Sequence, residues 1–447
     1  MQRYLIKNTS LINEGKIFSG DVLFENGRIE QISPKIDTKV AVKEINGEGK
    51  YLLPGIIDDQ VHFREPGLTH KATIYSESRA AVAGGVTSFM EMPNTIPPAL
   101  TQELLEEKYR TGASHSLCNY SFFMGVSNDN ADEVLKTNEK KNTVAGVKIF
   151  MGSSTGNMLV DNYLTLEKIF AGSEVLIATH CENEKIIRSN LEKLKQEKGE
   201  ALSAADHPLI RDEEACFESS LAAIQFAKKH NSRLHILHIS TEKELQLFSN
   251  MAPLAEKRIT AEVCVHHLYF TADDYPKYGN LIKCNPAIKA PHHKKALWQG
   301  LLDDRLDIIA TDHAPHTWEE KQRPYLQAPS GLPLVQHGLG MMLEHHQNGK
   351  ISLERIVEKM CHAPATCFQL SRRGFLREGY YADAVMLDLE QSTLVNKANI
   401  LYKCGWSPFE GHRFPGAVTH TFVNGQLVYE NGRFDEAVKG ERLSFER

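Results

Sequence analysis

The segment PGIIDDQVHFREPG, residues 54–67, joins a short apolar run to a dense set of polar side chains. Side chains alternate between the two faces of a strand, so we expect Asp58, Gln60, His62 and Arg64 to share one face. In a barrel of parallel strands, functional side chains come from the carboxyl-terminal ends of several strands. The segment therefore predicts the first strand of such a barrel, ending in a functional site.

Seven further apolar runs follow in the central part of the chain. They cover residues 85–92, 118–126, 146–152, 174–180, 233–240, 259–267 and 306–313. The intervening segments QELLEEKYR and ACFESSLAAIQFAKKH are amphipathic and predict helices. Strands alternating with helices predict an α/β fold, a (β/α)8 TIM barrel, over residues 56–370. An open doubly wound sheet would give the same pattern, but no GxGxxG follows a strand to favour a dinucleotide-binding fold.

Both ends of the chain differ from the central part in their sequence pattern. Residues 1–55 and 371–447 alternate short apolar runs with turn tripeptides such as ENG and VNG. An Asn-Gly pair between such runs is typical of a β-hairpin. We therefore expect a small β-sandwich domain formed from both termini, beside the barrel domain.

Composition excludes several classes of function. The net charge of the 447 residues is −6, with Lys and Arg scattered, which gives no general attraction to nucleic acid or anionic lipid. No apolar stretch approaches the roughly 20 residues that a membrane helix needs. The eight cysteines form no CxxC pairs, which is typical of reduced thiols in the cytoplasm. We therefore expect a cytoplasmic protein with a small-molecule substrate and with neither nucleic-acid nor membrane partners.

Several of the other runs carry residues of the kind that bind metals. Lys148 lies within the fourth run, His180 and His238 end the fifth and sixth, and Asp312 ends the eighth. Taken singly, each has a structural interpretation, such as a hydrogen-bonding histidine, a lysine reaching out of a sheet edge or a helix-capping aspartate. Together, imidazole and carboxylate ligands suit a catalytic zinc or a similar ion, which makes water nucleophilic near neutral pH. A buried lysine has a depressed pKa, so its neutral amine can react with carbon dioxide to give an anionic carbamate.

These motifs resemble the amidohydrolase superfamily, and more closely its dihydroorotase branch. The resemblance rests on PGIIDDQVHFREPG, EMPNT, GVKIFMG, THCEN, HIST, CNPAIK and ATDHAPHT, and it covers nearly the whole chain. It implies one or two zinc ions per chain, a homodimer, and Asp312 as general base as well as metal ligand. The implied metal ligands are His62, Lys148 in carboxylated form, His180, His238 and Asp312.

The resemblance also implies how the substrate is held. Arg64, Asn94 and His316 would bind a carboxylate, and Asn285 a polar edge of the ring. A guanidinium matches a carboxylate with two parallel hydrogen bonds, so Arg64 favours a substrate that carries one. The implied reaction is the reversible hydrolysis of the cyclic amide of (S)-dihydroorotate to N-carbamoyl-L-aspartate, in de novo pyrimidine (UMP) biosynthesis.

The loop from about residue 317 to 335 would close over the substrate, with backbone contacts from Ser330 and Gly331. It lacks the Glu that the family pattern leads us to expect near Gln336, which leaves open how the loop is anchored.

One departure affects the metal site directly. Gln60 stands where family members have His, and a neutral amide oxygen is a poorer zinc ligand than imidazole. The metal position on the first strand is therefore expected to be weaker, empty or reshaped around Asp58 or Asp59. Two alternatives stay open: a hydantoinase- or allantoinase-like enzyme acting on another cyclic amide, and a catalytically inactive dihydroorotase-like scaffold, which only Gln60 favours.

Overall fold

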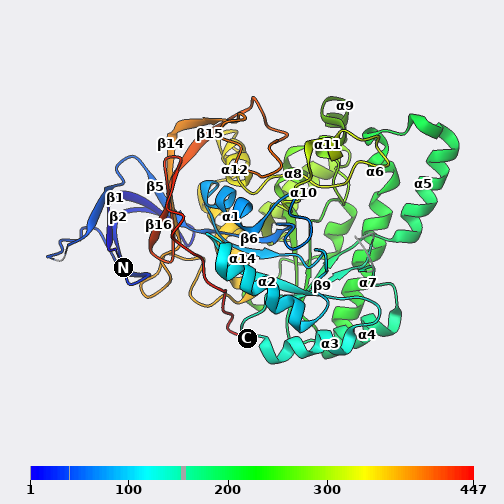
Figure 1. The fold of residues 1–447 in the computed structure, drawn as a ribbon, viewed down its shortest axis with the longest axis horizontal. Helices are drawn as coiled ribbons and strands as arrows, with labels where there is room; N and C mark the ends of the chain where they lie inside the picture. Colours follow the sequence, from blue (N-terminus) through cyan, green and yellow to red (C-terminus); the bar gives the residue numbers. More distant parts are fainter. Residues whose placement is uncertain (1, 40, 153–157) are drawn as a thin grey trace.

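The computed structural model describes residues 2–39, 41–152 and 158–447. Figure 1 shows a barrel surrounded by helices and, at one end of the molecule, a second sheet. In that sheet the blue N-terminal strands lie beside the red C-terminal strands. The two ends of the chain therefore build one structure next to the barrel.

Eight parallel strands form the barrel, in the order in which they occur in the chain. They are β6 (Ile56–Val61), β7 (Val86–Glu91), β8 (Asn119–Gly125), β9 (Gly146–Phe150), β10 (Ile177–His180), β11 (Leu234–Ile236), β12 (Ile259–Cys264) and β13 (Ile308–Ala310). Val61 bridges His313 in parallel, and the His62 amide donates to the His313 carbonyl at 2.7 Å, which closes the barrel. Each predicted run contains one of these strands, so the predicted TIM barrel is confirmed.

Helices cover the outside of the barrel, as parallel sheets require when both faces are buried. The α-helices of the described residues are α1 (Ile74–Ala83), α2 (Gln102–His115), α3 (Ala131–Leu135), α4 (Tyr163–Gly172), α5 (Glu184–Lys198), α6 (His207–Ile210), α7 (Glu213–His230), α8 (Val265–Tyr269), α9 (Tyr275–Tyr278), α10 (Pro291–Leu302), α11 (Trp318–Lys321), α12 (Gly338–Gln347), α13 (Leu353–Val357) and α14 (Ala363–Phe368). The two predicted helical segments lie in α2 and α7. In the described part of the chain, no helix has both the length and the apolar character needed to cross a membrane.

The second sheet has nine strands, mostly antiparallel. They are β1 (Tyr4–Asn13), β2 (Lys16–Glu25), β3 (Arg28–Ser33), β4 (Lys43–Asn46), β5 (Tyr51–Pro54), β14 (Ala384–Leu394), β15 (Arg413–Val423), β16 (Gln426–Glu430) and β17 (Arg433–Phe434). The rings of Phe24 on β2 and Phe422 on β15 lie 5.2 Å apart, although three strands separate β2 from β15 in the sheet. The predicted β-sandwich is therefore one sheet folded over its own core.

The division of the chain into domains stays a proposal: residues 1–55 with 371–447, and residues 56–370. The last residues also lie against the barrel, because the Tyr120 amide donates to the Glu441 carbonyl and the Leu443 amide donates to the Tyr120 carbonyl. The C-terminal tail thus connects the second sheet to β8.

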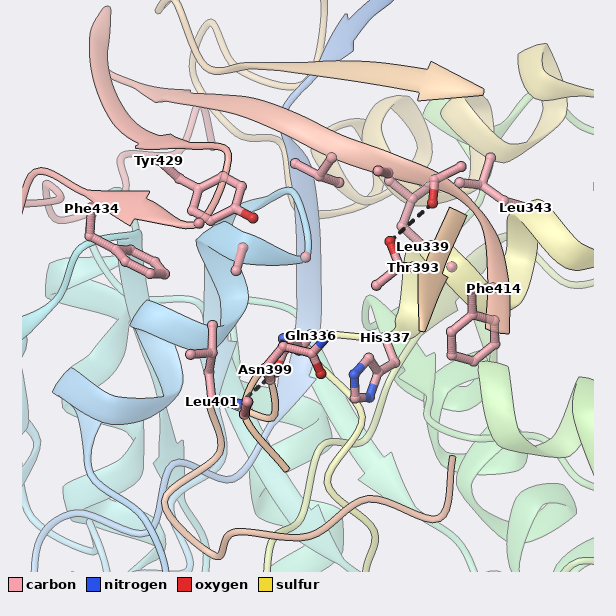
Figure 2. A pocket seen from close by; sticks show the side chains of 18 residues that line it. Gln336, His337, Leu339, Leu343, Thr393, Asn399, Leu401, Phe414, Tyr429 and Phe434 are labelled. Carbon is pink, nitrogen blue, oxygen red and sulfur yellow. Dashed lines mark hydrogen bonds between the residues drawn. The ribbon is translucent and has the colours of Figure 1, made fainter. Parts of the chain in front are cut away.

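A cavity of about 240 Å³ lies between the barrel and the second sheet, and Figure 2 shows Gln336 beside it. The Gln336 side-chain amide donates to the Asn399 carbonyl at 2.7 Å and accepts from the Leu401 amide at 3.0 Å, while its backbone N–H donates to the Tyr402 hydroxyl at 3.0 Å. A carboxylate at this position has no proton to donate to the Asn399 carbonyl. Gln336 therefore fixes the end of the 317–335 loop without the expected Glu.

Candidate active site

A cavity of about 390 Å³ lies at the carboxyl-terminal ends of the barrel strands. The structure brings together there every site residue that the sequence analysis selected. These are Gln60, His62, Arg64, Asn94, Lys148, His180, His238, Asn285, Asp312, His316, Ser330 and Gly331. Residues up to 271 positions apart in the chain share this pocket because the strand ends of a barrel meet at one face.

Three of these residues have a backbone conformation that side chains other than glycine rarely adopt. The φ angles are 69° for Arg64, 41° for His238 and 46° for Asp312. Such residues cost on the order of 1–3 kcal/mol each and cluster at functional sites. In β11 and β13 the strand ends two residues before the positive-φ residue, so the chain turns as its side chain enters the pocket.

His62 and Asp312 form the part of the site where the first and last strands meet. Burial lowers the pKa of His62, opposed by Asp312, so the ring is neutral and carries a single proton. Its Nδ1 lies 2.8 Å from the Asn94 side-chain oxygen, and its Nε2 lies 3.1 Å from Asp312 Oδ1. A ring that donates from Nδ1 presents a lone pair at Nε2 to a carboxylate. That pair of acceptors fits a cation between them.

His180 and His238 form the opposite part. His180 Nε2 lies 3.0 Å from Glu182 Oε2, and Arg211 pairs with the same carboxylate. Burial alone would raise the pKa of Glu182, but Arg211 and His180 outweigh it and hold the pKa at about 2. The ionised carboxylate fixes the proton of His180 on Nε2. Its Nδ1 then faces His238 Nε2 at 2.9 Å, a pair of nitrogens aimed at one point, as metal ligands are.

Lys148, on β9, lies buried within the pocket wall. Burial lowers its pKa to about 7, with Asp312 and Glu262 acting in the opposite direction. Near neutral pH a large share of this lysine is therefore the uncharged amine, the form that reacts with carbon dioxide.

The expectation that Asp58 shares a face with Gln60, His62 and Arg64 is wrong. The pairing of β6 with β7 shifts register between Asp58 and Val61, and a bulge of this kind breaks the alternation of faces. Asp58 instead accepts from the Thr311 amide and hydroxyl at 3.2 and 2.6 Å.

Asp59 also stays out of the pocket. Its carboxylate shares the imidazole of His235 with Glu262, at 3.3 and 3.2 Å from Nε2. Neither Asp58 nor Asp59 lines the pocket as a substitute for the histidine that Gln60 replaces.

A cationic subsite lies beside the candidate metal ligands. Arg64 is buried, and its Nε donates to the Pro315 carbonyl at 3.1 Å while Nη2 lies 3.1 Å from His316 Nε2. Burial lowers the Arg64 pKa to about 10, so the guanidinium stays charged at neutral pH. Within residues 2–39, 41–152 and 158–447, it forms no ion pair with a carboxylate. An anionic ligand is the partner that such a buried cation lacks.

Pro329, Ser330 and Gly331 of the 317–335 loop line the pocket, and we call residues 317–335 the roof loop. Lys321 is buried and donates to the carbonyls of Pro329 and Gly331, both at 2.9 Å. A Cβ at Gly331, where φ is 141°, would lie 2.3 Å from the Ala314 carbonyl oxygen, so this position requires glycine. The Ser330 carbonyl lies 3.0 Å from His316 Nε2.

The Asn285 side chain is fixed by His207, a residue outside the pocket lining. The Asn285 side-chain oxygen lies 3.0 Å from His207 Nε2, which also contacts the Cys284 carbonyl at 2.8 Å. The side-chain NH2 of Asn285 is the group left to face a ring carbonyl.

Sequence reasoning missed four residues that line the pocket: Lys71, Phe150, Ala314 and Pro329. Phe150 lies two positions after Lys148 on β9, so the alternation of faces could have identified it. Lys71 lies on the loop after β6, and its Nζ contacts Glu320 Oε1 at 3.0 Å and His316 Nδ1 at 3.1 Å. The periodicities of strands and helices cannot identify a loop residue such as Lys71.

The predicted ligands form two close pairs, His62 with Asp312 and His180 with His238, and Lys148 lies in the wall of the same pocket. In the described residues, the groups of His, Cys, Asp and Glu with all ligand atoms within 4.8 Å of one another are different ones. They are Cys264 with His266 and His267, and Asp59 with His235 and Glu262.

The barrel, with imidazoles, a carboxylate and a buried lysine at its strand ends, defines the class of TIM-barrel hydrolases that hold metal at this face. The Amidohydrolase family model matches residues 51–428, and the chain belongs to this family.

Relatives and a solved structure agree with this assignment. The chain is 33% identical over 410 residues to a dihydroorotase of Methanothermobacter thermautotrophicus, covering 91% of this chain and 90% of that one. It is 32% identical over 440 residues to a dihydroorotase of Listeria innocua, covering 96% and 99%. The L-hydantoinase (dihydropyrimidinase) from Arthrobacter aurescens has a TM-score of 0.91 at 28% identity, with 97% of each chain covered.

Proposed function

We propose that this protein acts as a dihydroorotase. It would hydrolyse the ring amide of (S)-dihydroorotate reversibly to N-carbamoyl-L-aspartate, as a step of pyrimidine synthesis in the cytoplasm, and would work as a homodimer. The observation that carries the proposal is the buried guanidinium of Arg64, charged and without a carboxylate partner in the described residues, in the same pocket as Asp312 and Lys148. The similarity to proteins named dihydroorotase, at 32–33% identity, supports it.

The residues present fit one or two zinc ions. His62, Lys148 in carboxylated form, His180, His238 and Asp312 would hold the metal. The close approach of His62 Nε2 to Asp312 Oδ1 at 3.1 Å, and of His180 Nδ1 to His238 Nε2 at 2.9 Å, supports this set of ligands. When bound, the metal supplies Lewis acidity and lowers the pKa of water.

The chain's own residues orient the substrate and move the proton. Arg64, Asn94 and His316 would hold the substrate carboxylate, and Asn285 would donate to a ring carbonyl, so that the amide carbon meets the attacking water. Asp312 would take a proton from that water as the new C–O bond forms. It would return the proton to the ring nitrogen as the C–N bond breaks. Ser330, Gly331 and the rest of the loop would exclude bulk water.

A second candidate is the hydrolysis of another cyclic amide, which the close structural match to an L-hydantoinase favours. Rates with dihydroorotate, hydantoin and allantoin on one preparation separate the two. The proposal expects turnover of dihydroorotate well above that of the rings without a carboxylate. Faster turnover of hydantoin or allantoin would replace it with the second candidate.

A further inference from the structure

A group of metal-type side chains lies behind the pocket wall, where β12 runs into α8. Cys264 ends β12, and His266 and His267 lie in α8, with all their ligand atoms within 4.8 Å of one another. We call these three residues the Cys264 cluster. All three are buried, and none of them lines the pocket. The cluster is therefore distinct from the metal ligands proposed above.

The ring nitrogens of the two histidines are the second observation. His267 Nε2 lies 3.1 Å from the Pro286 carbonyl, to which it donates, so Nδ1 is left with a lone pair. In the described residues that Nδ1 has no hydrogen-bond partner. The His266 ring interacts with the Thr311 backbone, but neither of its ring nitrogens forms a hydrogen bond of full geometry. Buried polar atoms are normally paired, and an unpaired one calls for an explanation such as an ion. A histidine that donates one N–H to a backbone carbonyl and directs its other nitrogen elsewhere has the usual arrangement of a metal ligand.

Another buried histidine of the barrel, His313, has a hydrogen-bond partner at each ring nitrogen. Its Nε2 lies 2.9 Å from Glu77 Oε2, and its Nδ1 accepts from the Leu334 amide at 2.9 Å. Within the described residues, His230 Nε2 and His345 Nε2 also lack a hydrogen-bond partner, but those two histidines belong to no group of metal-type ligands, whereas His266 and His267 lie with Cys264.

Burial is the main cause that raises the pKa of the Cys264 thiol well above its ordinary value, and Glu262 and Asp312 add to it. A thiol that coordinates a divalent ion nevertheless loses its proton. Binding would therefore convert the Cys264 S–H into a metal thiolate and release one proton to solvent.

We propose that the Cys264 cluster is a buried binding site for a zinc-like divalent ion, with one thiolate and two imidazole ligands. Thiolate sulfur and imidazole nitrogen are both ligand types that zinc takes in proteins. The Cys264 thiol contacts the Gln60 side-chain oxygen at 3.6 Å, so the cluster lies next to a residue that lines the pocket. The proposal does not depend on which substrate the pocket binds.

Cobalt replacement in the full-length protein tests the site, because only a sulfur ligand gives intense thiolate-to-cobalt absorption in the near ultraviolet. We expect this band in the wild type. We expect it in His180→Ala, which impairs the pocket ligands, and in Cys361→Ser, which removes a buried thiol that contacts the Pro54 carbonyl. Cys264→Ser and His267→Ala should lose the band and about one equivalent of metal. A cobalt-loaded wild type without the band, or a Cys264→Ser variant with unchanged metal content, would overturn the proposal.

The wild type alone gives a second readout that no folding defect can affect. X-ray absorption at the zinc edge should show a sulfur neighbour at about 2.3 Å. A zinc-loaded protein with only nitrogen and oxygen neighbours would contradict the site.

Discussion

His62 Nε2 and Asp312 Oδ1 lie 3.1 Å apart, although 250 residues separate them in the chain. The contact joins the end of the first barrel strand to the end of the last, next to the hydrogen bond from the His62 amide to the His313 carbonyl that closes the barrel. The same closure that completes the fold therefore brings a neutral imidazole to a carboxylate at the mouth of the pocket.

Removing the guanidinium tests the assigned carboxylate subsite. Arg64→Ala should lower kcat/KM for dihydroorotate at least about 100-fold, because hydrogen bonds to charged groups contribute about 1.5–3 kcal/mol each. Metal content should not change. The matched control is Arg323→Ala, which removes an exposed arginine of the roof loop. Steady-state kinetics with metal analysis check this. Equal losses of metal and of kcat/KM would remove Arg64 from the substrate contacts.

The depressed pKa of Lys148 predicts how its carboxylation depends on pH. Only the neutral amine reacts with carbon dioxide, and burial lowers the Lys148 pKa to about 7. The neutral fraction grows as the pH rises through that value, so the metal-free protein should bind more ¹³C-labelled carbon dioxide above pH 7 than below it. Carbon-13 NMR measures the carbamate, with Lys148→Met as the control. A signal that persists in Lys148→Met would contradict the assignment.

Glu182 should strengthen metal binding through His180, without contacting the metal itself. Its carboxylate fixes the proton of His180 on Nε2 and leaves Nδ1 free. Changes to such supporting carboxylates lower metal affinity about 10–100-fold, and we expect this of Glu182→Gln in competition with a chelator. Glu174→Gln, at an exposed residue paired with Lys141, should bind as the wild type does. If both variants bound metal equally, the support from Glu182 would be unnecessary.

Restoring an imidazole on the first strand tests the effect of Gln60. The side chain lines the pocket with His62 and Asp312, and an amide oxygen is a weaker zinc ligand than imidazole. Gln60→His should therefore tighten zinc binding at this position, as seen in titrations of the metal-free protein. Gln322→His, at an exposed residue of the roof loop, serves as the control. Unchanged zinc affinity in Gln60→His would show that residue 60 does not determine how tightly the pocket binds zinc.

Much of the fold and the composition of the pocket could be predicted from sequence, for a physical reason. Strands buried on both faces give continuous apolar runs, and the strand ends of a barrel converge on one face. The positions of His180, His238 and Asp312 at the ends of such runs were therefore enough to place them in one site. Their roles as ligands, base and substrate contacts stay predictions.

Other features depend on geometry that a linear pattern does not carry. A register shift in β6 moved Asp58 out of the expected face, to pair with Thr311. Lys71 reaches the pocket from a loop, where no periodicity applies. The sequence pattern gives no function to the pair His266 and His267, because only the packing of α8 against β12 shows their ring nitrogens buried and close to Cys264.

The most direct measurement is the hydrolysis of dihydroorotate by the purified full-length protein, with bound zinc quantified on the same sample. The proposed function predicts turnover to N-carbamoyl-aspartate with at least one zinc ion per chain, despite Gln60. No turnover of dihydroorotate by zinc-loaded protein supplied with bicarbonate would contradict it.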